Sequence, residues 1–162
     1  RLIAGRNELL MQRKVFFVAT GGFDSNDNQN QNQPGVLADV SESMAAFYDA
    51  MGELGVSDSV TAFTQSDFGR TLTSNGDGTD HAWGGNQIVI GDAVNGGQLI
   101  GSYPELQIGG PEDVGGGRFI PSTSADQFAA TLAQWFGIPD SDLDVVAPNL
   151  GNFAVRNLGF IG

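Results

Sequence analysis

Apolar and polar residues alternate along this chain in blocks that predict a strand, a helix and a second strand. Residues 15–20 (VFFVAT) are almost continuously apolar and end at two glycines. Such a run is typical of a strand that is buried on both faces, as in a parallel sheet. Residues 34–54 predict a helix, and residues 59–65 predict the next strand. The apolar positions at helical spacing are Leu37, Val40, Met44, Phe47, Met51 and Leu54.

The order strand, helix, strand predicts a right-handed parallel crossover. We therefore expect an α/β fold with a largely parallel central sheet and flanking helices. In open sheets of this class, ligands bind beyond the carboxyl ends of the strands. Asp24 follows the first predicted strand, Asp67 follows the second, and the pair Asp80-His81 comes further along the chain. These four side chains are predicted to converge at one edge of the sheet.

The rest of the chain adds shorter predicted elements. Residues 87–94 and 97–104 predict short strands, and residues 104–123 predict a long loop. Ser124 and Gln127 form a capping-box pattern at the start of a helix that ends before Gly137. Residues 1–12, which include Met11, predict the end of a helix, and the tail predicts a docked irregular segment. No linker interrupts the pattern, so residues 1–162 are predicted to form a single domain.

The amino-acid composition of the chain excludes several classes of function. The net charge is −12, with 19 acidic and 7 basic residues, so nucleic acid is an unfavourable partner. The chain contains no cysteine, which excludes disulfides and thiolate metal sites. No apolar run reaches the roughly 20 residues of a membrane span. The chain begins at Arg1 instead of a methionine, as expected of a processed or partial chain.

The only histidine, His81, lies next to Asp80 in a loop rich in Gly, Asn and Asp. Asp and His together supply oxygen and nitrogen ligands, which suit zinc and related ions. Two-metal hydrolases use mixed Asp and His ligands of this kind. Asp24, Asp67, Asp80 and His81 are therefore the candidate metal ligands. The alternative is a hydrogen-bonded loop histidine without a metal.

Calcium or magnesium is an alternative to zinc. Two loops alternate oxygen-bearing side chains as calcium loops do; their residues are Asp24, Asn26 and Asn28, and Asn75, Asp77 and Thr79. The first loop has Gln29 and Gly35 where an EF-hand needs glycine and glutamate. The alternative for both loops is Asx-type turn chemistry.

Arg70 is the candidate substrate-binding residue, because a guanidinium can clamp an oxyanion with two hydrogen bonds. It could equally pair with one of the acidic residues. The sequence contains no G-x-S-x-G, no Walker A motif and no G-x-G-x-x-G after a strand, so no catalytic nucleophile is assigned and nucleotide binding has no support.

Four blocks in order resemble the domain-of-unknown-function 1501 family: KVFFVATGGFDSNDNQ, SDFGRTLTSNGDGTDHAWGGN, GGGRFIPSTSADQFAATLAQWFG and PNLGNF. That family consists of bacterial proteins, commonly exported, of the alkaline phosphatase and sulfatase superfamily. The resemblance implies an alkaline phosphatase-like fold, of which this chain is the C-terminal portion. It also implies metal ligation by Asp24, Asp67, Asp80 and His81, with the protein in the periplasm or outside the cell.

The chain departs from the family pattern at two positions. Asn26 stands where the family usually has a histidine, and Ala82 stands where it often has a glycine. An amide oxygen is a poorer zinc ligand than an imidazole, so Asn26 shifts the expected preference toward calcium or magnesium. The superfamily's nucleophile lies in an N-terminal segment that this chain does not match, so a preceding segment or another chain would supply it.

Two functions follow from these observations. The first is a metal-dependent hydrolase of phosphate or sulfate esters, incomplete in this chain, with a small ester as substrate. The second is a non-catalytic extracellular structural or binding protein that retains the fold, with calcium as an expected ligand. A homo-oligomer is compatible with either function.

Overall fold

The structure is a computed structural model that describes residues 1–10 and 12–162. Met11 therefore lies outside the described residues. Instead of a continuous helix, residues 2–10 form successive turns, in which Gly5 N donates to Arg1 O at 3.0 Å and Leu9 N donates to Gly5 O at 3.1 Å. The predicted helix end is thus replaced by isolated turns.

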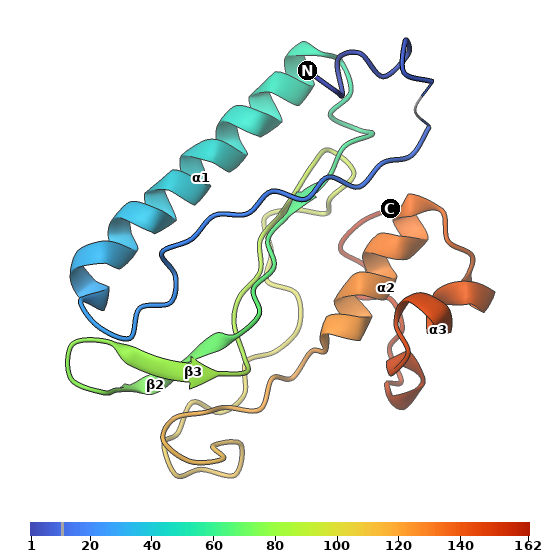
Figure 1. The fold of residues 1–162 in the computed structure, drawn as a ribbon. Coiled ribbons are helices and arrows are strands. Elements are labelled where there is room, and N and C mark those ends of the chain that lie inside the picture. The colour runs from blue at the N-terminus through green and yellow to red at the C-terminus, as the bar shows by residue number, and fades with distance from the viewer. Residues whose placement is uncertain (11) are drawn as a thin grey trace.

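One long helix comes first along the chain, short strands follow it, and shorter helices come last (Figure 1). The α-helices are α1 (Gln29–Glu53), α2 (Ala125–Phe136) and α3 (Leu143–Val146). The strands are β1 (Ala62–Phe63), β2 (Gly69–Ser74), β3 (Thr79–Ala82) and β4 (Val89–Ile90). Two 3-10 turns, η1 (Asp140–Asp142) and η2 (Leu150–Asn152), flank α3. No helix among the described residues is long and apolar enough to cross a membrane.

Helix α1 confirms the predicted helix but begins five residues before Pro34. The earlier start is explained by contacts with the β2–β3 turn. Gln29 N donates to Asp77 O at 3.0 Å, and the Gln29 side chain accepts a hydrogen bond from Thr79 Oγ1 at 2.9 Å. These contacts hold the first turn of the helix. At the other end, Gly55 adopts a positive φ of 65° directly after the C-cap.

The predicted largely parallel central sheet is wrong. The described residues form two sheets, each of two antiparallel strands: β1 pairs with β4, and β2 pairs with β3. The strand predicted at 59–65 is reduced to the two residues of β1, and 97–104 contains no strand. The α/β architecture with flanking helices, and the alkaline phosphatase-like sheet that the resemblance implied, are therefore not what the chain forms.

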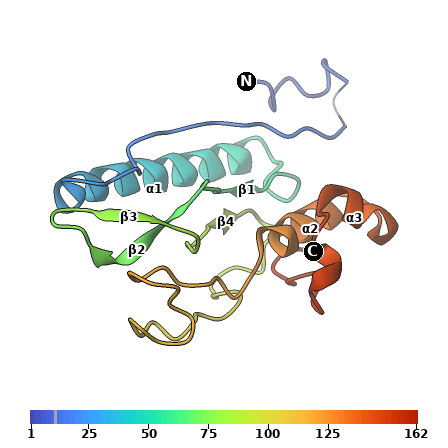
Figure 2. The ribbon, with the colours of Figure 1, turned by 60° about the horizontal axis from the view of Figure 1, so that its bottom comes forward.

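The physical reason lies in residues 15–20. This segment is extended but belongs to no sheet, and none of its backbone N–H or C=O groups bonds to another described residue. In Figure 2 it passes on one side of α1, while β1 lies on the other side. Both segments run in the same direction (Figures 1 and 2), as a crossover requires. Without backbone contact between them, however, no parallel ladder forms.

A cluster of buried hydrophobic residues lies around α2 and α3. It consists of Ala130, Leu143, Ala147 and Leu150, with Ala133 and Ile138 packed against it. The predicted capping box is confirmed, because Gln127 N donates to Ser124 Oγ at 3.1 Å and Ser124 N donates to Gln127 Oε1 at 3.0 Å. The tail thus docks on α2 through short helical turns.

Candidate functional site

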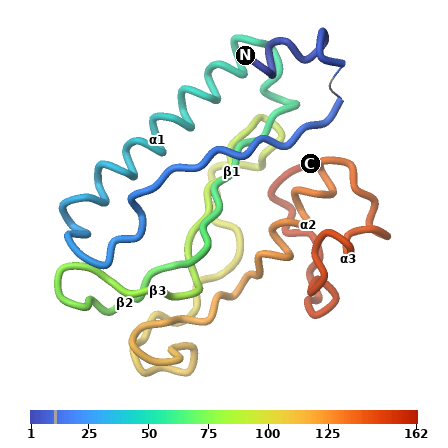
Figure 3. Tube along the Cα trace, in the orientation of Figure 1, coloured from blue at the N-terminus to red at the C-terminus, as the bar shows by residue number. Residues whose placement is uncertain are grey.

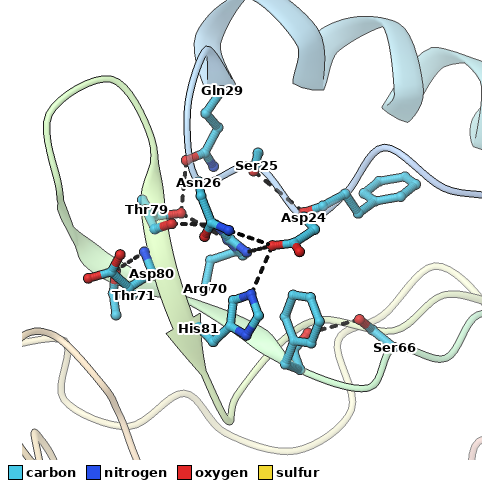
Figure 4. A network of polar contacts seen from close by, with 12 residues as sticks. Asp24, Ser25, Asn26, Gln29, Ser66, Arg70, Thr71, Thr79, Asp80 and His81 are labelled. Carbon is cyan, nitrogen blue, oxygen red and sulfur yellow. Dashed lines mark hydrogen bonds and ion pairs between the residues drawn. The ribbon is translucent and has the colours of Figure 1, made fainter.

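Asp24 and His81 meet at the centre of a polar cluster (Figure 4). His81 Nε2 lies 2.8 Å from Asp24 Oδ1. Asp24 belongs to the loop that follows the extended segment 15–20, and His81 lies on β3. The side chains of both residues are about half exposed, at 57% for Asp24 and 50% for His81. The contact is therefore open to solvent on one side.

The loop 24–28 reaches β3 because its backbone can approach the β2–β3 turn closely at Gly78. A Cβ atom at Gly78 would lie 2.4 Å from the carbonyl oxygen of Asn26, so only glycine allows this approach. Two hydrogen bonds fasten the loop to the turn. Thr79 N donates to Ser25 O at 3.3 Å, and Asn75 Nδ2 donates to Asn26 O at 3.0 Å. The loop and the hairpin therefore form one unit.

Arg70 fills the space between this loop and β3. Its Nη1 atom donates to Asp24 Oδ1 at 2.9 Å, and its Nη2 atom donates to Asn26 Oδ1 at 2.8 Å. The Nε atom donates to Thr79 Oγ1 at 3.0 Å, and Nη2 also donates to the Thr79 carbonyl. The side chain is only 16% exposed. Arg70 thus pairs with an acidic residue of its own chain, which was one of its two sequence interpretations.

Phe68 completes the cluster and was missed by the sequence reasoning. Its ring stacks on the His81 imidazole, with centroids 3.9 Å apart and planes inclined by 11°. Arg70 Cζ lies 5.7 Å from the centroid of the same ring. Phe68 directly precedes the strand in which Arg70 pairs with His81. That adjacency is the only signal that could have indicated it.

Asp80 does not join the site. Successive residues of a strand point to opposite faces, so Asp80 and His81 cannot both face Asp24. Asp80 Oδ1 instead accepts a hydrogen bond from Asn75 Nδ2 at 2.9 Å. Figure 4 shows Asp80 turned away from Asp24 and His81.

Asp67 also lies outside the cluster. It is exposed in the loop before β2, and its side chain forms no hydrogen bond or ion pair with another described residue. The structure therefore brings together Asp24 and His81 but not Asp67 and Asp80.

As they lie, the residues do not fit a divalent metal ion. In the part of the chain that the structure describes, no three His, Cys, Asp or Glu side chains are grouped closely enough to hold one. Asp24 Oδ1 is already contacted by three nitrogen atoms, those of Arg70 Nη1, His81 Nε2 and Asn26 Nδ2. The assignment of zinc, calcium or magnesium to Asp24, Asp67, Asp80 and His81 stays a prediction.

The second calcium-like loop uses its oxygen atoms within the turn. Asn75 Oδ1 accepts a hydrogen bond from Gly78 N at 3.2 Å, and Thr79 Oγ1 is shared between Arg70 and Gln29. This is the Asx-type turn chemistry that the sequence left open as the alternative.

The cluster lowers the pKa of the Asp24 carboxyl below its ordinary value of 3.8. The hydrogen bond with His81 is the largest cause, and the hydrogen bond from Arg70 is the second. Both partners favour the charged form of the carboxylate. Asp24 is therefore ionised at neutral pH and acts as an acceptor within the cluster.

A second carboxylate, Asp113, organises the glycine-rich loop beside the hairpin (Figure 3). Asp113 Oδ1 accepts backbone hydrogen bonds from Gly115, Gly117 and Arg118 at 2.8, 3.0 and 3.1 Å, and Oδ2 accepts one from Gly109 at 2.9 Å. The bond from Gly109 is the main cause of a lowered pKa of Asp113. This role was also missed by the sequence reasoning.

Comparison with known proteins identifies the family. A family model described as "Protein of unknown function (DUF1501)" matches residues 3–145, which is most of the chain. The chain belongs to the DUF1501 family. No curated protein and no solved structure matches it.

Membership in DUF1501 confirms the family to which the sequence motifs pointed. The match includes Asp24, Asn26, Arg70 and His81, so the whole polar cluster lies within the family domain. The family description assigns no activity to this DUF1501 chain.

Proposed function

We propose that this chain is a non-catalytic structural or binding component that assembles through the extended segment 15–20. The observation that carries the proposal is the exposure of this apolar segment together with a backbone that bonds to no other described residue. All six residues are exposed, and Phe17 and Val18 are 91% and 89% exposed. Their successive side chains point to opposite sides, so the segment presents apolar groups on both faces.

A backbone of this kind is a template for another strand. Unpaired N–H and C=O groups along an extended apolar segment pair readily with a second extended chain. Burial of one large apolar side chain contributes about 1.5–3 kcal/mol. Association therefore removes both an apolar surface and a row of unpaired polar groups from water.

A second copy of the chain is the partner that the charges favour. Arg13 and Lys14 precede the segment, and Asp24 and Asp27 follow it. In an antiparallel pair of identical segments, the basic end of each copy lies beside the acidic end of the other. Opposite charges at both ends of the pair support this orientation.

The proposed location is the periplasm or the outside of the cell, on the ground that proteins of this family are commonly exported.

Sedimentation equilibrium tests the proposal. The wild-type chain is expected to form a dimer in a concentration-dependent manner, and the Phe17→Ser, Val18→Ser double variant is expected to weaken that dimer at least about tenfold. Val145→Ser is the matched control, because Val145 is 83% exposed on α3. A wild-type chain that sediments as a monomer at every concentration would refute the proposal.

Cross-linking provides an independent readout. Because the chain has no cysteine, Val18→Cys introduces a single thiol. In an antiparallel dimer paired along 15–20, residue 17 of one copy lies opposite residue 18 of the other. A mixture of Phe17→Cys and Val18→Cys chains is therefore expected to form an intermolecular disulfide much faster than Val145→Cys, and equal rates would contradict pairing through this segment.

The second candidate function is ester hydrolysis, and the Asp24–His81 pair is the observation that favours it. A carboxylate that holds an exposed imidazole is a common arrangement for general acid–base catalysis. The resemblance to a family placed in the alkaline phosphatase and sulfatase superfamily supports the same reaction class.

Release of p-nitrophenol from p-nitrophenyl phosphate and p-nitrophenyl sulfate tests this candidate. Hydrolysis by the wild-type chain that is lost in His81→Ala would support it, and the matched Tyr103→Ala variant is expected to leave turnover unchanged. The absence of turnover with both esters would leave the non-catalytic proposal as the better account.

A further inference from the structure

We infer that the guanidinium of Arg70 is the built-in cation of the Asp24 site and keeps divalent metal ions out of it. The inference is independent of the proposed assembly, because it depends only on contacts within one chain. It concerns the residues that a metal would need most, Asp24 and His81.

The first step is the arrangement of oxygen atoms around Arg70. Its nitrogen atoms contact Asp24 Oδ1 at 2.9 Å, Asn26 Oδ1 at 2.8 Å and Thr79 Oγ1 at 3.0 Å, together with the Thr79 carbonyl. Carboxylate, amide, hydroxyl and carbonyl oxygens are also the groups that bind calcium and magnesium. The guanidinium therefore takes up the oxygen atoms that a hard cation would use.

The second step is the fixed position of the guanidinium. Arg70 lies on β2 directly opposite His81 on β3, and its side chain is largely buried. Phe68 covers one side of it, with the ring centroid 5.7 Å from Arg70 Cζ. Donors at Nε, Nη1 and Nη2 are all engaged, so rotation of the side chain out of the site would break several hydrogen bonds at once.

The third step is charge. Arg70 neutralises the one carboxylate of the cluster, and a divalent ion at Asp24 would lie within a few ångströms of a positive guanidinium. Like charges at that distance repel strongly in a partly buried site. The metal would also have to break the contact between His81 and Asp24 in order to use the imidazole nitrogen. Arg70 and His81 together thus occupy the Oδ1 atom of the carboxylate that a metal would need.

Isothermal titration calorimetry tests the inference by measuring the binding of zinc chloride and of calcium chloride. The four proteins are wild type, Arg70→Met, Arg70→Lys and Arg118→Met. Wild type and Arg118→Met are expected to show no saturable binding, and Arg118→Met controls for the loss of one positive charge. Arg70→Met is expected to bind at least one of the two metals at least about tenfold more tightly than wild type. Arg70→Lys keeps a cation and is expected to behave as wild type.

The double variant Arg70→Met, Asp24→Asn assigns the new site. It is expected to lose the binding that Arg70→Met gains. A folded Arg70→Met variant that binds neither metal more tightly than wild type would overturn the inference.

The wild-type protein provides a second measurement in case Arg70→Met does not fold. Its single histidine gives one set of imidazole NMR signals, which are expected to stay unchanged when one equivalent of zinc chloride is added. A shift or broadening of these signals that is complete at one equivalent of zinc would show that Arg70 does not exclude the metal.

Discussion

His81 Nε2 lies 2.8 Å from Asp24 Oδ1, although the two residues are 57 positions apart in the chain. The contact joins the loop that follows the exposed segment 15–20 to strand β3. Arg70 contacts the same oxygen atom from β2. Three segments of the chain are therefore linked through one carboxylate, and each partner can be removed separately.

Replacement of His81 by alanine is expected to raise the pKa of Asp24 toward its ordinary value of 3.8, because the bond with His81 is the main cause of the lowered value. Arg70→Met is expected to raise the pKa of Asp24 by a smaller amount, because its bond is the second cause. Carbon-13 NMR of the side-chain carboxyl groups as a function of pH measures both effects. Asp113, whose pKa is lowered mainly by the backbone bond from Gly109, is the internal control and should keep its lowered pKa in all three proteins.

Asp113→Asn is expected to lower the melting temperature by several degrees, on the order of 5 °C. Both oxygens of Asp113 accept hydrogen bonds from backbone N–H groups. An asparagine would replace one of these oxygens with an NH₂ group, which cannot accept a hydrogen bond. Differential scanning calorimetry measures the change, with Asp39→Asn as the matched control. If both variants have the melting temperature of the wild type, Asp113 does not organise the loop.

The stability of the wild-type protein is expected to depend on pH through the same carboxylate. The pKa of Asp113 is lower in the folded protein than its ordinary value of 3.8. Its contribution is therefore fully present above that value and is lost as the pH falls through the lower folded pKa. Urea unfolding between about pH 6 and pH 3 should show a smaller loss of stability in Asp113→Asn than in wild type. A parallel loss in both proteins would contradict this assignment.

Gly117→Ala is expected to destabilise the protein more than Gly109→Ala. Both glycines have similar positive φ values, 73° and 76°, so the conformational strain is about the same. A Cβ at Gly117 would lie 2.8 Å from Thr73 N, whereas a Cβ at Gly109 would meet nothing within 4 Å. The difference in the free energy of unfolding is expected to be about 1–3 kcal/mol. Equal effects in urea unfolding would mean that the glycine loop does not pack on β2 as described.

Leu143→Ala is expected to lower the free energy of unfolding by roughly 2–5 kcal/mol, because it leaves a cavity in the core around α2 and α3. Leu143 is completely buried, and Val145 on the same helix is largely exposed. Val145→Ala is the matched control and should change stability by less than about 0.5 kcal/mol. Urea unfolding followed by circular dichroism measures both variants. Similar losses would show that α3 is not part of the core.

The features of this protein that depend on neighbouring residues could be predicted from the sequence. The periodic apolar positions between Leu37 and Leu54 predicted most of α1, and Ser124 with Gln127 predicted the start of α2. Helix hydrogen bonds and caps form between residues a few positions apart, so a local pattern is enough to indicate them. The motif blocks also indicated the family, because their order along the chain can be read without a structure.

Strand pairing and the contacts between distant side chains depend on the folded chain and could not be predicted in this way. Residues 15–20 have the composition of a buried strand, but pairing requires a partner brought from elsewhere in the chain, and none of the described segments bonds to them. The sequence placed Asp80 and His81 in one site because they are adjacent, whereas the pleat of β3 turns them to opposite faces. Arg70 joined Asp24 because Gly78 lets the loop 24–28 approach the hairpin, and this contact depends on backbone distances that no local pattern records.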